Sequence, residues 1–235
     1  MSHRRTVYLV ERDLGARRIL ISHLAQIAAE PWPFAGGDEF LGMLDHLAPA
    51  CVLLDMDIEA PDGLAVLAEL VRRQPGWPVI GVSGRGDLPL AVEAMKLGAL
   101  DFLEKPPSAA RLAAALAPAW TALERAMEAG EARRIAGERL ARLTRRELDI
   151  SLGLFSGRSN KAIAHDLGIS VRTVEMHRAH VMAKLGVRSL AEAAVLATQA
   201  GLAITPSYLR QALGTQVPSA DPSAGFLGRR LAAGG

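Results

Sequence analysis

Four polar side chains of different chemistry each follow a short apolar run in the first half of the chain. Glu11 follows TVYLV, Asp55 follows CVLL, Ser83 follows VIGV, and Lys105 comes two residues after the end of DFL. Continuous apolar runs are typical of strands that are buried on both faces of a parallel sheet. The carboxyl ends of such strands meet at one edge, where ligands bind in this fold class. Two carboxylates, a hydroxyl and an ammonium at that edge indicate a binding site.

The residues around this set have the pattern of strands alternating with helices. Apolar side chains recur at three- and four-residue spacing in 14–29 and 64–73, as they do in amphipathic helices. We expect strands at 6–10, 32–34, 51–54, 79–82 and 101–103, and helices at 14–29, 38–47 with Asp38 as its cap, 64–73, 88–97 and from Ser108 onward. These alternations predict an α/β fold, a doubly wound five-stranded parallel sheet of the flavodoxin type.

Residues 5–120 resemble the receiver domain of two-component response regulators, and the FixJ type in particular. The resemblance is clearest in GRGDLPLAVEAMKLGALDFLEKP, residues 84–106. It implies a CheY-like receiver in which Asp55 accepts a phosphoryl group from a sensor histidine kinase. Ser83 would donate a hydrogen bond to that group, and Lys105 would pair with it as a point charge.

The same resemblance implies a Mg²⁺ ion held by Glu11, Asp55 and the backbone carbonyl of Asp57, because Mg²⁺ prefers oxygen ligands. The chain departs from the family at the second acidic position after the first strand, which holds Arg12. A guanidinium there would repel the metal or pair with Asp55 in its place. Asp13 could compensate, although its position favours the start of the following helix.

A switch from the phosphoryl site to a dimer surface is also implied by the resemblance. Phe102, the aromatic residue of the last strand, would take a buried rotamer when the phosphoryl group draws Ser83 inward. The surface formed by helix 88–97, the last strand and the helix from Ser108 would change as a result, and it commonly dimerises in this family. The alternative is that Phe102 is a fixed core residue.

A long helix is expected after the receiver. Residues 108–143 are rich in strong helix formers and carry an apolar stripe at three- and four-residue spacing, formed by Leu112, Leu116, Trp120, Leu123 and Met127. Pro118 should kink this helix, and Gly130 and Gly137 should loosen its later part. The stripe fits either a dimer contact or packing on the receiver itself, and we favour the dimer.

Residues 159–188 have the pattern of two short helices around a tight turn. Gly168 allows the chain to reverse, and Ser170 is placed to cap the second helix. The apolar residues of the second helix recur at helical spacing, and they are Val171, Val174, Val181, Met182 and Leu185. This pattern predicts a helix-turn-helix whose second helix fits the DNA major groove. An ordinary amphipathic helical hairpin shares the same periodicity.

Residues 143–193 resemble the effector domain of LuxR/NarL-type regulators. The matching positions are Leu143, Thr144, Arg146, Glu147, Gly157, Asn160, Lys161, Ile163, Ala164, Leu167, Ser170, Thr173, Val174, Glu175, His177, Lys184 and Leu185. The resemblance implies an all-α four-helix DNA-binding domain that closes with a helix over 189–200. Thr144 and Glu147 have the spacing of a capping box at its start.

The residues expected to contact DNA lie on the two helices of the helix-turn-helix. Asn160 and Lys161 are well placed for backbone phosphates, and the resemblance implies phosphate contacts from Arg172, Thr173, His177 and Lys184, with Arg178 on the same polar surface. Glu175 and Met176 are expected to face base edges, although the family often uses that glutamate for support. His165, His177 and His180 have no Cys or carboxylate partner at ligand spacing in the sequence, so we expect no metal site here.

Charge is divided unevenly between the two halves of the chain. Residues 1–107 carry ten Lys/Arg against fifteen Asp/Glu, a net of −5, whereas residues 108–235 carry seventeen against ten, a net of +7. A positive second half attracts a phosphate backbone. The single cysteine, Cys51, fits a reducing compartment. No apolar run is long enough for a membrane span and no signal peptide is evident, so we expect a cytoplasmic protein.

Together these features predict a transcriptional regulator, not an enzyme, that binds double-stranded promoter DNA as a homodimer and acts on RNA polymerase. We divide the chain into a receiver at 1–120, a helical linker at 121–142, a LuxR-type DNA-binding domain at 143–203 and a disordered tail at 204–235. The alternative is an atypical receiver, regulated by a partner or independent of phosphorylation because of Arg12, with DNA binding retained.

Overall fold

The computed structural model describes residues 5–84 and 86–202. The chain divides into two compact units, Met1–Gly130 and Glu131–Gly235. The tail predicted at 204–235 lies outside the described residues. Each unit has its own apolar core, so each is described by itself.

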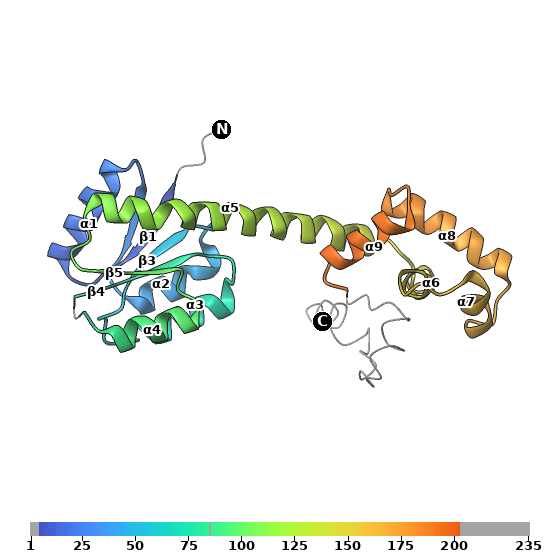
Figure 1. Ribbon diagram of the computed structural model, residues 1–235, viewed down its shortest axis with the longest axis horizontal. Helices are drawn as coiled ribbons and strands as arrows, with labels where there is room; N and C mark the ends of the chain where they lie inside the picture. The colour runs from blue at the N-terminus through green and yellow to red at the C-terminus, as the bar shows by residue number, and fades with distance from the viewer. Residues whose placement is uncertain (1–4, 85, 203–235) are drawn as a thin grey trace. The chain divides into compact units, whose positions relative to one another are not determined.

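The first unit is built on a five-stranded sheet with the order β2-β1-β3-β4-β5. Helices flank this sheet, with α5 on one side and α3 and α4 on the other (Figure 1). Every pair of neighbouring strands is parallel. All residues of the central strands β3 and β4 are buried, whereas β2 is an edge strand that tolerates two prolines. The strands are β1 Thr6–Val10, β2 Glu30–Phe34, β3 Cys51–Asp55, β4 Val79–Ser83 and β5 Asp101–Glu104. The order reverses between β1 and β3, which is where ligands bind in doubly wound sheets.

Helices cover both faces of this sheet. One face packs on α1 (Leu14–Gln26) and α5 (Ala109–Leu140), and the apolar core between them includes Leu24 and Leu112. The other face packs on α2 (Gly37–Met43), the 3-10 turn η1 (Leu44–His46), α3 (Gly63–Arg73) and α4 (Leu88–Leu97). The predicted doubly wound fold is confirmed. The first helix is shorter than the predicted 14–29, because the chain leaves the helix at Ile27 and turns at Ala28, where φ is 55°.

Aspartates set the starts of three helices in the first unit. Asp13, Asp62 and Asp87 each accept a hydrogen bond from the backbone N–H three residues later, at the starts of α1, α3 and α4. The predicted cap at Asp38 was wrong, because α2 begins after Gly36 and Asp38 lies in its first turn. Glu39 takes over part of that role, since its Oε2 accepts from the backbone N–H of Ala35 at 2.6 Å.

Gly63 allows α3 to begin directly against the loop that follows Asp55. A Cβ at this position would lie 2.6 Å from Met56 Cα and 2.9 Å from Met56 O. These neighbours are backbone atoms and cannot rotate away. The absence of a side chain at residue 63 therefore holds the segment after β3 close to α3.

Helix α5 continues without interruption through Pro118. The residues of its first turns, such as Leu116, pack on the sheet, whereas Ala136 and Leu140 belong to an apolar cluster of the second unit. The prediction of one helix from the receiver into the linker is confirmed, and Pro118 does not end it. None of the helices within residues 5–84 and 86–202 combines the length and the apolar character needed to cross a bilayer.

The second unit contains α6 (Arg145–Phe155), α7 (Asn160–Asp166), α8 (Val171–Leu185) and α9 (Leu190–Gln199). Gly168, with φ 63°, lies in the turn between α7 and α8. Arg146 secures that turn, because its Nη2 donates to the backbone carbonyl of Leu167 at 2.7 Å. The predicted caps are present: Ser170 caps α8, and Thr144 with Glu147 forms the capping box of α6.

Candidate functional site

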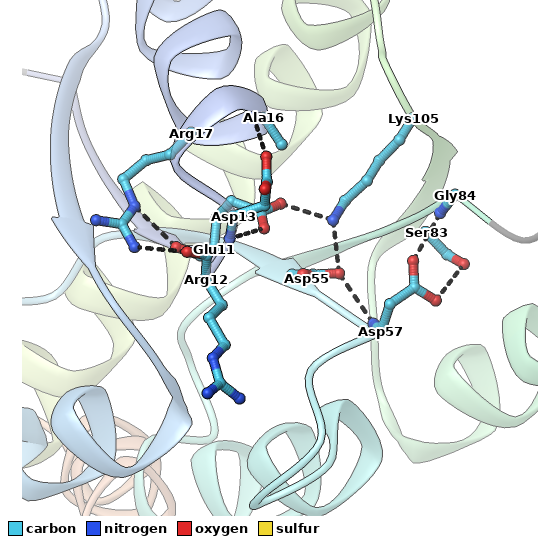
Figure 2. A network of polar contacts seen from close by, with 10 residues as sticks. All are labelled: Glu11, Arg12, Asp13, Ala16, Arg17, Asp55, Asp57, Ser83, Gly84 and Lys105. Carbon is cyan, nitrogen blue, oxygen red and sulfur yellow. Dashed lines mark hydrogen bonds and ion pairs between the residues drawn. The ribbon is translucent and has the colours of Figure 1, made fainter.

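Four polar residues from four strands lie together at the carboxyl edge of the sheet (Figure 2). Glu11 directly follows β1, Asp55 ends β3, Ser83 ends β4 and Lys105 directly follows β5. Glu11 and Ser83 are fully buried, and Asp55 is 5% exposed. The structure therefore places all four residues of the sequence analysis in one site.

The ammonium of Lys105 lies between the two carboxylates of this site. Its Nζ is 2.6 Å from Glu11 Oε2 and 2.7 Å from Asp55 Oδ1. Burial lowers the pKa of Lys105, but the hydrogen bonds to Asp55 and Glu11 outweigh this effect, so the pKa is raised above its usual value. Burial raises the pKa of Glu11, although Lys105 and the backbone N–H of Asp13 counteract the shift. A protonated Lys105 thus holds both acids in place.

Asp57 contributes its side chain to the site. Its Oδ1 accepts from the hydroxyl of Ser83 at 2.9 Å, and its Oδ2 accepts from the backbone N–H of Gly84 at 2.7 Å. Its own backbone N–H donates to Asp55 Oδ1 at 2.9 Å. From the sequence, only the backbone carbonyl of Asp57 was expected to take part in the site. The sequence does show an acidic residue, Asp57, two positions after Asp55. It does not show where the side chain points, because the hydrogen bonds that orient it come from Ser83 and Gly84 at the end of β4.

Arg12 lies at the rim of the site, where its side chain is exposed and points away from Asp55 (Figure 2). The cation that pairs with Asp55 is Lys105, so the expected pairing of Arg12 with Asp55 does not occur in this structure. Asp13 caps α1 and does not turn into the site. Arg17 adds a second guanidinium nearby, donating to the backbone carbonyls of Glu11 and Arg12.

The donor set fits a hard divalent cation, with one acid fewer than receivers usually have. Glu11 and Asp55 place two carboxylate oxygens within 2.7 Å of a single nitrogen, so one small cation can reach both. Asp55 Oδ2 has no hydrogen bond or ion pair to any of the residues that the structure describes. Arg12 occupies the position of the missing acid, and its side chain is exposed at the rim of the site.

Phe102 lies on β5 beside β4. Its side chain is half-buried and packs against the apolar cluster beneath α2, α3 and α4. A Cβ at Gly81 would lie 2.9 Å from its ring, so the ring rests directly on β4. The role of Phe102 as a switch stays a prediction.

One stripe of α8 is open to solvent in the second unit. Arg172, Glu175, Met176 and Ala179 are all exposed, on the side opposite the buried Val174. Lys161 at the start of α7 and Arg178 on α8 are exposed as well, and Asn160 is half-buried. These residues remain available for the DNA contacts predicted from the sequence.

Three other predicted DNA contacts lie on the flank of α8 that carries internal contacts. Lys184 Nζ is 2.6 Å from Oε2 of Glu147, which is buried on α6. The hydroxyl of Thr173 is 2.8 Å from that of Ser170, and His177 is half-buried with its Nδ1 enclosed. Lys184 therefore joins α8 to α6, and a DNA phosphate would have to compete with Glu147 for its ammonium.

Glu147, a carboxylate that ligand spacing in the sequence does not reveal, lies beside His177 and His180. One possible ligand atom from each of these three residues lies within 4.8 Å of the others. The sequence hid this group because Glu147 is about thirty residues away on another helix. Oε2 of Glu147 already accepts from Lys184 and from the backbone N–H and hydroxyl of Thr144, so this carboxylate has a structural role.

The ion pair between Glu147 and Lys184 makes the stability of the second unit depend on pH. The hydrogen bond from Lys184 lowers the pKa of Glu147 from 4.5 to about 2. Because the folded pKa is below the unfolded one, this stabilisation is complete above pH 4.5 and disappears as the pH falls toward 2. Glu147→Gln should lower the free energy of unfolding by about 1–3 kcal/mol at neutral pH and flatten its dependence on pH over that window.

Urea unfolding of the full chain at several pH values measures this effect. Tryptophans occur only at positions 32, 77 and 120, so their fluorescence follows the first unit while far-UV circular dichroism detects both. Glu175→Gln is the matched control, because this exposed glutamate on α8 should leave the pH profile unchanged. Equal pH profiles for wild type and Glu147→Gln would contradict the assignment.

The sheet order and the acidic edge with its lysine define a receiver domain, and α7 with α8 defines a helix-turn-helix. Residues 7–117 match the family described as response regulator receiver domain, and residues 141–197 match bacterial regulatory proteins of the luxR family. The chain belongs to the two-component response regulators that carry a LuxR-type DNA-binding domain, and within them it is a FixJ-like transcriptional regulator.

Its similarity to FixJ proteins extends over most of the sequence. It is 38% identical over 196 residues to FixJ of Bradyrhizobium diazoefficiens, covering 83% of this chain and 96% of that protein. It is 40% identical over 200 residues to FixJ of Azorhizobium caulinodans, covering 84% and 93%. Among solved structures, the response regulator StyR matches with a TM-score of 0.67 and 30% identity, covering 84% of this chain and 100% of that one. Full-length FixJ from B. japonicum matches with a TM-score of 0.50 and 37% identity, covering 85% and 98%.

Proposed function

We propose that a sensor histidine kinase phosphorylates this regulator on Asp55, and that phosphorylation promotes dimerisation and binding to promoter DNA in the cytoplasm, where the protein acts on RNA polymerase. The observation that carries this proposal is the contact between Lys105 and Asp55 at the carboxyl edge of the sheet. It supports a nucleophile that is held in position, with a positive charge beside the oxygens of an incoming phosphoryl group.

The chemistry assigned to Asp55 is attack by a carboxylate oxygen on the phosphorus of a phosphohistidine. The new P–O bond forms an acyl phosphate while the P–N bond breaks, and its electron pair returns to the imidazole nitrogen of the kinase. Lys105 and the backbone N–H of Asp57 occupy Oδ1 of Asp55, which leaves Oδ2 with available lone pairs. Mg²⁺, held by Glu11, Asp55 and the carbonyl of Asp57, would neutralise charge on the phosphoryl oxygens.

The proposal is tested with the full chain in the presence of Mg²⁺ and acetyl phosphate. Intact-mass spectrometry should detect one added phosphoryl group, and light scattering should detect dimerisation. Promoter affinity, measured by fluorescence anisotropy, should rise with phosphorylation. Unchanged mass, oligomeric state and DNA affinity would exclude phosphorylation as the switch.

An atypical receiver, controlled by a partner or independent of phosphorylation, is the second candidate. The observation that favours it is Arg12, which places a guanidinium where a second acid is usual. In that case DNA binding would be retained without phosphoryl transfer, and the affinity for promoter DNA would be the same in wild type and in Asp55→Ala.

Replacing Arg12 by aspartate should separate these two candidates. The change removes one positive charge and adds one negative charge beside Glu11 and Asp55, so Mg²⁺ should bind at least about tenfold more tightly. Isothermal titration calorimetry with MgCl₂ measures the affinity. Arg18→Asp makes the same change of charge on an exposed position of α1 and serves as the control. Equal affinities in Arg12→Asp and Arg18→Asp would mean that the local charge at residue 12 does not limit metal binding.

A further inference from the structure

The donors that would bind a phosphoryl group at the end of β4 are already engaged by an acidic side chain. The hydroxyl of Ser83 and the backbone N–H of Gly84 both donate to the carboxylate of Asp57, at 2.9 Å and 2.7 Å (Figure 2). Each donor binds a different carboxylate oxygen, so Asp57 accepts the two hydrogen bonds in a bidentate manner. A hydroxyl next to a backbone N–H at the end of a strand is a typical site for an anion.

Asp57 reaches this position because it lies two residues after Asp55 on the same loop. The backbone N–H of Asp57 donates to Asp55 Oδ1 at 2.9 Å. This hydrogen bond holds the main chain of Asp57 beside the carboxylate of Asp55. Ser83 is fully buried at the end of the neighbouring strand β4, and Asp55 pairs with Val82 in the sheet register. A phosphoryl group on Asp55 would thus extend into the region where the Asp57 carboxylate meets Ser83.

Charge makes simultaneous occupation unfavourable. A phosphoryl group carries between one and two negative charges, and Asp57 carries one. The positive charge in contact with Asp55 comes from Lys105, which is shared with Glu11. Two anions competing for the same two donors repel each other unless one of them leaves.

We propose that Asp57 is a tethered anionic ligand of the phosphoryl pocket, which a phosphoryl group must displace before it can bind Ser83 and Gly84. This inference rests on the proposed role of Asp55 as phosphoryl acceptor. The tether gives the carboxylate a high effective concentration at the two donors. The receiver therefore resists phosphorylation until a donor strong enough to expel Asp57 is present.

The test compares wild type with Asp57→Ala and Asp57→Asn in the full chain. Beryllofluoride, an analogue of the phosphoryl group, is titrated by calorimetry in saturating Mg²⁺, and phosphorylation by acetyl phosphate is timed by intact mass. Asp57→Ala should bind beryllofluoride about tenfold or more tightly than wild type and should be phosphorylated faster. Asp57→Asn, which keeps one acceptor oxygen but loses the charge, should lie between them.

Glu59→Gln is the matched control, because it removes one negative charge from the same loop at an exposed residue. It should behave as wild type. Hydrogen exchange of the Gly84 amide gives a second readout: it should be faster in Asp57→Ala than in wild type, and beryllofluoride should slow it again. Thermal melting verifies that each variant is folded.

The possible outcomes separate this inference from the proposed function. Phosphorylation of wild type and Asp57→Ala at the same rate, with equal affinity for beryllofluoride, would overturn the inference and leave Asp55 as the acceptor. Faster phosphorylation of Asp57→Ala than of wild type, with tighter binding of beryllofluoride, would support the inference. A failure of both proteins to bind beryllofluoride or to gain mass would overturn the role of Asp55, and the inference with it.

Discussion

Asp55→Asn is expected to abolish covalent phosphorylation of this protein. The amide has nearly the same shape as the carboxylate, but its nitrogen carries no lone pair suited to attack on phosphorus and it has no negative charge. The contact with Lys105 Nζ, which is 2.7 Å from Asp55 Oδ1, can be kept by the amide oxygen. The variant should therefore remain folded while the gain of mass with acetyl phosphate falls to background.

Asp45→Asn is the matched control for this substitution. The exposed carboxylate of Asp45 pairs with the half-buried guanidinium of Arg73, 2.6 Å away, in the turn η1 that follows α2. Such surface pairs contribute about 0–1 kcal/mol, so the control should be folded and phosphorylated as wild type is. An equal gain of mass in Asp55→Asn would mean that another residue accepts the phosphoryl group.

The second large effect is expected on DNA binding. Arg172→Ala and Lys161→Ala each remove an exposed cation from the helix-turn-helix, and together they should weaken promoter binding by about a hundredfold at moderate salt. Each lost phosphate contact should also reduce the slope of log affinity against log salt by about one. Fluorescence anisotropy over a series of salt concentrations measures both quantities.

Two comparisons make this test specific. Arg133→Ala removes the same charge from an exposed position of α5 and should leave affinity and slope near the wild-type values. Lys184→Ala should act differently, because the ammonium of Lys184 lies on Glu147 and its loss should lower the stability of the second unit more than the salt slope. A full loss of slope in Lys184→Ala, with none in Arg172→Ala, would reverse the assignment of the contact face.

The sequence was sufficient to predict the order of the elements and the polar residues at the ends of the central strands. Buried parallel strands need nearly continuous apolar runs, so the polar residues Asp55 and Ser83 marked the carboxyl ends of β3 and β4. The helix-turn-helix could also be predicted from the sequence. Gly168 forms the turn and Ser170 caps α8, and both roles depend only on residues nearby in the chain.

Partners distant in the chain were harder to predict. Lys184 pairs with Glu147 across 37 residues, and that choice is made by the packing of α8 on α6. The position of Asp57 in the sequence revealed its backbone role, but the direction of its side chain is set by donors on another strand. At the start of α2, both Asp38 and Glu39 have a carboxylate that can accept a hydrogen bond from a backbone N–H. The helix begins after Gly36, so Asp38 lies in the first turn, and Glu39 accepts from the backbone N–H of Ala35.

The close approach at Gly63 has a consequence for how this protein can diverge. Residue 63 must be glycine for steric reasons and not because of its backbone torsion angles. The main chain of Met56 fills the space that a side chain at residue 63 would need. Glu59 and Ala60, which lie between Met56 and Gly63, are exposed. Substitutions at the exposed loop residues can thus change the surface beside the acidic site. At residue 63, in contrast, any residue other than glycine would clash with the main chain of Met56.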